Sequence, residues 1–381
     1  MRRIYLDNAA TTAVSPEVLE AMLPYFTQVS GNASSIHGYG REAKRAIENA
    51  RRQVMRALNA AAPQEIYFTS GGTESDNWAI KGAALAIGKG HIVTTAIEHH
   101  AVLHTCQWLE KQGYTVTYLP VDEYGRVTAA QVEAALREDT ILVSVMAANN
   151  EVGTLQPIAE IGALCRARGV LFHTDAVQAA GAIPLDVQAM NIDLLSLSGH
   201  KLHGPKGAGV LYVRKGVKIE TLLHGGAQER GFRAGTENVP AIVGLGKAVE
   251  LAQEHLAQNA AQVMCLRDKL ISGLMERVPG AKLNGHPTGR LPNNVNISFD
   301  RVEGEALLLR LDLVGVAGSS GSACTSGAID PSHVLLALGL TPSQANGALR
   351  LTLSTDTTEE EIDAVLDILP PIVEDLRRML R

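Results

Sequence analysis

Lys201 and Asp175 follow two successive strand-like segments, and their types suit a covalent cofactor site. Lys201 stands in "SGHKLHGPKGAG", shortly after the run 192–198, and Asp175 follows the run 170–174. A lysine at such a position either binds phosphate as a point charge or supplies an amine that forms a Schiff base. A buried carboxylate such as Asp175 is costly alone, and a protonated ring nitrogen would compensate it.

The segment "SGGTES", residues 70–75, has the composition of an anion-binding helix start. Gly71, Gly72 and Thr73 open a predicted helix directly after the strand-like run 65–69. Free amides and the helix dipole at such a start bind phosphate, although a simple strand-to-helix turn is the alternative. The segment matches neither GxGxxG nor the Walker P-loop. Lysine, aspartate and phosphate site together predict pyridoxal 5'-phosphate (PLP).

Polar side chains also follow other predicted strands. They are Glu98, His99 and His100 after the run 91–97, Asn149, Asn150 and Glu151 after the run 140–148, Gln178 beyond Asp175, and Ser198 with His200 before Lys201. In open α/β sheets, ligands bind outside the carboxyl ends of the strands. We therefore expect these side chains to converge on one edge of a sheet.

Short β-rich runs alternate with helix-like segments from residue 64 to residue 198, which predicts an α/β fold with a largely parallel, doubly wound sheet. The order of its strands is not predicted. The segment 244–278 has a helical apolar face and indicates a bridge to a second, smaller domain that contains strand-like runs 293–300 and 348–354. Ser15 with Pro16, and Thr358 with Glu361, are predicted helix starts.

The bulk composition describes an ordinary globular chain of 381 residues, with 46% hydrophobic and 19% charged residues. A net charge of −6 argues against direct nucleic-acid binding, since that usually needs a basic excess. The longest apolar runs fall short of the roughly 18 residues of a membrane helix, and "MRRIYLDNAATT" lacks a secretory h-region. We expect no membrane contact and a reducing, cytoplasmic location.

Cys324 stands among small residues in "GVAGSSGSACTSGAID", residues 315–330. Nothing there is bulky enough to build a core, so the composition predicts a loop in which the thiol can move. A cysteine thiolate is a strong nucleophile, and an incidental loop cysteine is the alternative. Cys106, Cys165 and Cys265 lie in helix-like segments and are predicted to pack as small hydrophobic residues.

Motifs along the chain resemble those of the class V, fold-type I PLP-dependent enzymes, and most closely the NifS/IscS-type cysteine desulfurases. They are "YLDNAATT", "SGGTESDN", "EHHAVL", "NNEVGT", "HTDAVQ", "SGHKLHGPKG", "RAGTEN" and "SSGSACTSG". The resemblance implies a large PLP-binding domain, residues 16–255, with a mainly parallel sheet of the seven-stranded type. It also implies a smaller α+β domain, residues 1–15 and 256–381, that carries the cysteine loop at about 315–330.

The resemblance further implies a role for each site residue. Lys201 would bind the cofactor covalently, Asp175 would pair with its ring nitrogen, and His99 would stack on the ring and move protons. Asn150 and Arg350 would hold the substrate carboxylate, and Cys324 would take sulfur from L-cysteine as a persulfide and release L-alanine. The remaining implied cofactor contacts are Gly72, Thr73, Asn150, Gln178, Ser198, His200 and, across a dimer interface, Thr236.

The implied partners are a second copy of the chain and a sulfur-acceptor protein, either an iron–sulfur scaffold or a tRNA thiolase. No metal is expected in the chain itself, although Cys324 could ligate a cluster on a partner. Iron–sulfur assembly, nitrogenase maturation, tRNA thiolation and DNA phosphorothioation stay open as pathways. The alternatives are a metal site at His100 and His104, another PLP activity such as selenocysteine lyase or aminotransferase, and a catalytically silent scaffold.

Overall fold

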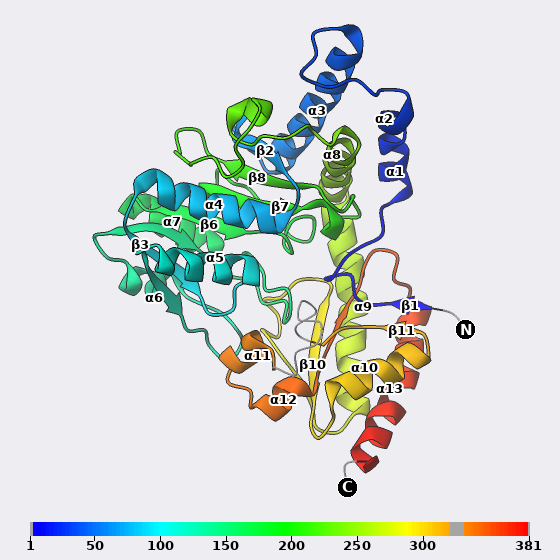
Figure 1. Cartoon of the computed structure of the whole chain (residues 1–381). Helices are drawn as coiled ribbons and strands as arrows, with labels where there is room; N and C mark the ends of the chain where they lie inside the picture. Colours follow the sequence, from blue (N-terminus) through cyan, green and yellow to red (C-terminus); the bar gives the residue numbers. More distant parts are fainter. Residues whose placement is uncertain (1–2, 321–330, 380–381) are drawn as a thin grey trace.

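The computed structural model describes residues 3–320 and 331–379, so Cys324 lies outside the described residues. Figure 1 shows a large part built around a central sheet and a small part below it, with helices α8 and α9 running along both. Each part has a hydrophobic core of its own. The predicted domain boundaries after residues 15 and 255 stay a prediction.

The central sheet has seven strands in the order β2-β8-β7-β6-β5-β3-β4. Only β8 runs against the others, because it pairs antiparallel with both β2 and β7 while the remaining pairs are parallel. The predicted mainly parallel sheet of seven strands is confirmed. The strands are β2 (Ile66–Thr69), β3 (His91–Thr95), β4 (Thr115–Leu119), β5 (Thr140–Ser144), β6 (Leu171–Asp175), β7 (Leu194–Ser198) and β8 (Gly209–Val213).

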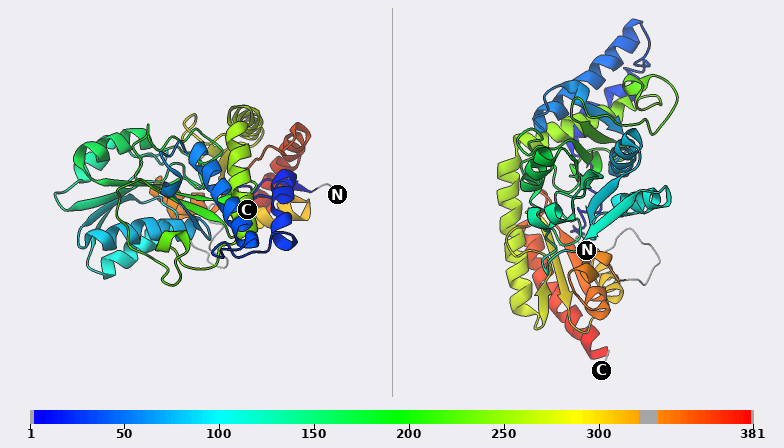
Figure 2. Two further views of the ribbon diagram at one scale, coloured as in Figure 1. Left: turned by 90° about the horizontal axis from the view of Figure 1, so that it is seen from above. Right: turned by 90° about the vertical axis from the view of Figure 1, so that its left-hand side faces the viewer.

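Helices cover both faces of this sheet, as the left view in Figure 2 shows. Successive side chains of a strand point to opposite faces: Leu195 packs on one side of the sheet and Leu194 on the other. Helices α4 (Gly72–Ile87) and α5 (His100–Lys111) cover the face of Leu194. The opposite face is covered by α3 (Gly38–Ala57), α6 (Ala129–Ala135), α7 (Ile158–Arg168) and α8 (Val239–Glu254), with α1 (Pro16–Met22) and α2 (Pro24–Thr27) beside α8.

In the small part, helices α9, α10 and α13 share one core with a three-stranded antiparallel sheet of order β12-β10-β9, and a short parallel pair β1-β11 adjoins it. Helices α11 and α12 pack instead near the strand ends of the large part, where Leu335 shares a core with Ile97 and Met146. The elements are β1 (Ile4–Tyr5), α9 (Leu256–Arg277), β9 (Ala281–Leu283), β10 (Asn294–Phe299), α10 (Gly304–Leu313), β11 (Val316–Ala317), α11 (His333–Ala337), α12 (Pro342–Asn346), β12 (Ala348–Thr352) and α13 (Glu359–Met379).

The bridge predicted at 244–278 consists of two helices, α8 and α9, which meet at His255. Its apolar face is confirmed, since Val263, Leu270 and Leu274 are buried in the core of the small part. Ser15 caps α1, and Thr358 exchanges hydrogen bonds with Glu361 at the start of α13, as predicted. The prediction that Cys265 packs in the core is wrong: it lies on the outer face of α9, whereas Cys106 and Cys165 are buried.

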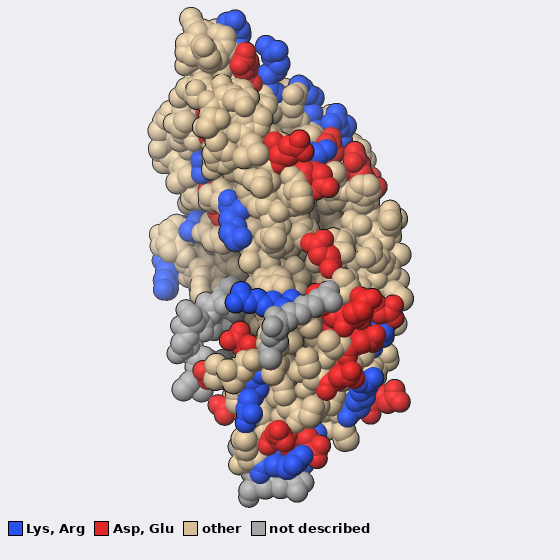
Figure 3. All heavy atoms as spheres, turned by 90° about the vertical axis from the view of Figure 1, so that its right-hand side faces the viewer, with Lys and Arg blue, Asp and Glu red and all other residues tan. Residues whose placement is uncertain are grey.

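The surface carries mixed charge. Figure 3 shows one face on which Lys and Arg side chains are interspersed with Asp and Glu along the length of the molecule. Among the described helices, none combines the length and the apolar character needed to cross a lipid bilayer.

Candidate active site

The carboxyl ends of β2, β3, β5, β6 and β7 meet at one edge of the sheet, and a cavity of about 340 Å³ opens there. Ten of the residues predicted for the site line this cavity: Gly72, Thr73, His99, Asn150, Asp175, Gln178, Ser198, His200, Lys201 and Arg350. A larger cavity of about 680 Å³ shares Lys201 and Gln178 with it but reaches neither Asp175 nor His99. The smaller cavity therefore holds the groups that can do chemistry.

One end of the cavity is formed by the start of α4. The first amides of a helix have no acceptor within the helix, so those of α4 are available to an anion. Gly72 keeps this approach open, since a Cβ at that position would lie 2.7 Å from Val177 Cγ2. Gly209 is equally constrained, because a Cβ there would lie 2.6 Å from Gly71 Cα. Thr73, Ser198 and His200 add side-chain donors, and this end suits a phosphate group.

Lys201 extends from the short 3-10 helix η2 (Gly199–Lys201) that follows β7. Its Nζ donates to the carbonyl oxygens of Ala9 and Ala10, in the segment that follows β1. Gln178 also donates to Ala9 O, at 3.0 Å. The segment 7–12 thus forms one wall of the cavity and holds the lysine amine at its edge.

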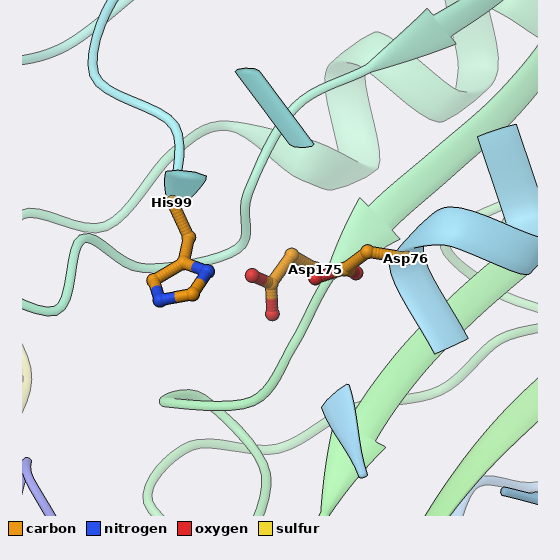
Figure 4. A group of neighbouring side chains, drawn as sticks. All are labelled: Asp76, His99 and Asp175. Atoms are coloured by element: carbon orange, nitrogen blue, oxygen red, sulfur yellow. The ribbon is translucent and has the colours of Figure 1, made fainter. Parts of the chain in front are cut away.

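Asp175 ends β6 and points into the cavity, where its Oδ1 accepts a hydrogen bond from Val177 N at 2.9 Å. Burial raises the pKa of Asp175 to about 6. Asp76 of α4 lies beside it, and the His99 ring faces the pair (Figure 4). One oxygen of each carboxylate and one nitrogen of His99 lie within 4.8 Å of one another. The floor of the cavity is therefore rich in buried acid and favours a cation.

His99 caps helix α5, and its Nδ1 accepts from Ala101 N at 3.1 Å. This bond assigns the proton of the neutral ring to Nε2. Burial and the charge of Lys201 lower the pKa of His99 to about 4. The imidazole is thus neutral at physiological pH, which is the state that a proton acceptor needs.

Arg350 of β12 is 2% exposed, and it is a residue of the small part that lines the cavity. Its Nη2 donates to Asp7 Oδ1 at 2.9 Å and its Nη1 to Asn150 O at 3.1 Å. Its Nε has no hydrogen-bond partner among the described residues. A guanidinium that is held from two sides and has a buried donor left over suits a substrate carboxylate.

Two predicted site residues are not in this cavity. Thr236 lies exposed between the 3-10 helix η3 (Gln228–Gly231) and α8, outside the residues that line the chain's own cavity. The nearby Arg233 makes a bidentate ion pair with Glu74 of α4, at 2.8 and 3.0 Å, which fixes this loop beside the helix start. Cys324 lies outside the described residues.

Three neighbours of the predicted site residues do not stand at the ends of predicted strands and were not predicted. They are Asp7, which pairs with Arg350, Asp76, which lies beside Asp175, and Ser332, which donates to Glu151. A signal existed for Asp76, because it stands three residues after Thr73 and so lies on the same face of the helix. Asp7 follows a strand of only two residues, and the pairing of that strand with β11 is not readable from one sequence.

The donor set fits PLP. The glycine-rich start of α4 leaves room for the phosphate, and the buried Asp175 carboxylate provides negative charge for a ring cation. Lys201 lines the same cavity and offers the amine.

The chain matches the family described as "Aminotransferase class-V" over residues 4–365. A curated relative, "Cysteine desulfurase IscS" from Methanosarcina thermophila, is 58% identical over 380 residues, which is 99% of this chain and 94% of the relative. The solved structure "NIFS-LIKE PROTEIN" has a TM-score of 0.92 at 43% identity and covers 98% of this chain and 100% of its own. Another solved structure, "SspA in complex with cysteine", has a TM-score of 0.82 at 40% identity. The match covers 93% of this chain and 100% of the chain in that structure.

Proposed function

The chain belongs to the class-V aminotransferase family and, within it, to the PLP-dependent cysteine desulfurases, and we propose that it converts L-cysteine to L-alanine while the sulfur passes to Cys324. The observation that carries the role of Cys324 is the anchoring of the chain on both sides of it. Ser319 exchanges backbone hydrogen bonds of 3.0 and 2.6 Å with Arg350, and Ser332 Oγ donates to Glu151 Oε2 at 2.5 Å. Arg350 and Glu151 both line the cavity.

The short sequence distance from these anchors limits how far Cys324 can lie from them. Cys324 stands four positions after Ser320 in the chain. Four residues span at most about 14 Å when fully extended. This limit on the chain length between Ser320 and Cys324 supports the proposed role of Cys324 as the sulfur acceptor.

The cofactor is held by the groups that line the cavity. Lys201 binds it covalently, and Asp175 pairs with its ring nitrogen. Thr73, Ser198, His200 and the first amides of α4 hold its phosphate, and Gln178 contacts its ring oxygen. When bound, PLP supplies a carbonyl group that condenses with amines and a ring that withdraws electrons from the substrate carbons.

The substrate is oriented by Arg350 and Asn150. Arg350 binds the carboxylate of L-cysteine, and its pairing with Asp7 keeps the guanidinium in place. His99 accepts and returns protons from its position facing Asp175, since burial keeps the ring neutral.

In the sulfur-transfer step, the thiolate of Cys324 attacks the sulfur of the bound substrate. An S–S bond forms and the C–S bond of the substrate breaks. The electron pair of that bond stays on the substrate carbon, which takes up a proton, and the product leaves as L-alanine. The sulfur remains on Cys324 as a persulfide, which is then handed to an acceptor protein for iron–sulfur cluster assembly or thio-modification.

The working unit is a homodimer in a reducing, cytoplasmic setting. Thr236 is exposed and lies outside the cavity of its own chain, and the Arg233–Glu74 pair holds its loop at the outer side of α4. A second copy of the chain therefore receives this threonine at its phosphate site. A reducing compartment keeps the Cys324 thiol free to react again.

Release of alanine from L-cysteine by the purified protein tests this function. The native chain and Cys265→Ala, which changes an exposed cysteine on α9, should both release alanine. Cys324→Ala should bind PLP and L-cysteine, which absorbance reports, but release none. Alanine from Cys324→Ala would exclude this cysteine as the sulfur acceptor, and no alanine from the PLP-loaded native chain would reject L-cysteine as the substrate.

A further inference from the structure

Asp76 is a buried carboxyl group that the proposed reaction leaves without a task. It is 1% exposed, and its Oδ1 has no hydrogen-bond partner among the described residues. The Asp175 carboxylate is its neighbour, with an oxygen within 4.8 Å (Figure 4). Two ionised carboxylates at this distance in a dry site repel each other strongly, so the pair must be compensated or must keep a proton.

Among the residues that the structure describes, no positive charge acts to lower the pKa of Asp76. His173 of β6 is a basic neighbour of Asp76, with Nε2 at 3.6 Å from Asp76 Oδ1. Burial lowers the pKa of His173 to about 3, and its ring nitrogens pair with Ser144 and Ser196. Glu98, which follows β3 in the chain, is a further buried carboxyl group, and burial raises its pKa to about 8. The cation at this site, Lys201, acts on Asp175 and on the His99 ring.

The two carboxyl groups differ in which form their surroundings stabilise. Asp175 accepts a backbone hydrogen bond from Val177 and feels the charge of Lys201, and both favour its ionised form. Asp76 has one oxygen, Oδ1, without a donor. Burial and the charge of Asp175 raise the pKa of Asp76 well above the ordinary value, against the opposing effect of one hydrogen bond with Ser196. The proton of the pair therefore belongs on Asp76.

We propose that Asp76 is a positioning residue: it carries the single proton of the Asp76–Asp175 pair, and as a neutral acid it keeps Asp175 the carboxylate that pairs with the cofactor ring. The inference rests on the proposed cofactor site. A neutral Asp76 adds no repulsion beside Asp175, whereas an ionised one would push the Asp175 carboxylate away from the position in which it would pair with the ring nitrogen. Asparagine, which is neutral and of the same shape, should replace Asp76 in this task.

Infrared spectroscopy of the holoenzyme tests the proton directly, because a protonated carboxyl group has a C=O stretching band apart from the carboxylate bands. The native protein should show such a band at neutral pH, shifted by 13C-labelled aspartate and missing in Asp76→Asn. The label separates Asp76 from Glu98, which is not labelled. Asp193→Asn is the control, since Asp193 is buried but ion-paired with Arg214 at 2.6 Å, and its removal should take away no such band.

Titration of the apoprotein with PLP tests whether Asp76 keeps Asp175 ready to pair with the cofactor ring. Asp76→Asn should bind PLP within about threefold of the native protein, while Asp76→Leu should bind on the order of tenfold more weakly because it offers no polar group to Asp175. Leucine as good as asparagine would show that residue 76 only fills space and would overturn the proposal. A native holoenzyme without a label-sensitive band would also overturn it, even if the variants failed to fold.

These measurements need neither L-cysteine nor Cys324. A protein that shows the band and the predicted PLP affinities but releases no alanine would support the role of Asp76 while rejecting the proposed substrate. The reverse result, alanine release without the band, would reject the role of Asp76 alone.

Discussion

Arg350 Nη2 lies 2.9 Å from Asp7 Oδ1, and this ion pair ties β12 of the small part to the residues that follow β1. The same residues, 7–12, supply the carbonyl oxygens that receive the Lys201 amine. The group proposed to bind the substrate carboxylate and the group proposed to bind the cofactor therefore share one short segment as a common support.

Loss of the Arg350 guanidinium should weaken substrate binding more than cofactor binding. Arg350→Ala should raise KM for L-cysteine by roughly 10- to 100-fold, because hydrogen bonds to a charged group are lost. Asp7→Asn should raise KM less, since it only loosens the arginine. Steady-state alanine release measures both, with Asp300→Asn, an exposed carboxylate beyond β10, as the control. An unchanged KM in Arg350→Ala would remove this residue from the substrate site.

Lys201 should be the only lysine whose removal stops the reaction. Lys201→Ala should lose the absorbance of covalently bound PLP and all alanine release, since no other amine lines the cavity among the described residues. Lys206→Ala changes an exposed lysine in the same glycine-rich segment and should keep both. Retained turnover in Lys201→Ala would contradict the assignment.

The polar residues at the strand ends were predictable from the sequence, because each directly follows an apolar run. The residues that hold them in place were not predictable, because they come from distant parts of the chain. A polar residue after an apolar run, such as Asp175 or His99, is visible without knowing the fold. The position of β8 between β2 and β7 depends on an antiparallel strand that returns from beyond Lys201. The contact of Arg350 with Asp7 joins residues 343 positions apart. Such long-range pairings leave no periodic pattern in one sequence.

Acid should destabilise the fold partly through His173. Its pKa lies at about 3 in the folded protein and at 6.5 ordinarily, so the unfolded chain binds more protons between these values. Its contribution to stability is thus complete above pH 6.5 and is lost as the pH falls towards 3. His173→Asn should reduce the acid-side slope of the unfolding free energy by up to about 1.4 kcal/mol per pH unit.

Urea unfolding at several pH values measures this slope. His224→Asn, at an exposed histidine, should leave the slope as in the native protein. Equal slopes in His173→Asn and the native chain would mean that His173 is not the group that titrates.

The ion pair between Arg51 of α3 and Glu229 of η3 should contribute strongly to the stability of the large part. The two groups meet through two hydrogen bonds of 2.8 Å, and both side chains are 4% exposed. Arg51→Met leaves the Glu229 carboxylate buried without its cation, which should cost about 3–5 kcal/mol of unfolding free energy. Urea unfolding followed by fluorescence reports this part, because both tryptophans, Trp78 and Trp108, lie in the helices that cover its sheet.

The double variant Arg51→Met/Glu229→Met distinguishes the energy of the Arg51–Glu229 interaction from the energy of the other contacts that each residue makes. It removes both charges, so it should be less destabilised than the sum of the single variants, as expected for residues in direct contact. The exposed pair Arg137–Asp139 is the matched control, with side chains 48% and 51% exposed. Arg137→Met should change the unfolding free energy far less than Arg51→Met, because exposed ion pairs contribute little to stability. Additive losses at Arg51 and Glu229 would mean that each residue stabilises the loop through other contacts, such as the Arg51 bond to Ile66 O at 2.6 Å, and not through their mutual pairing.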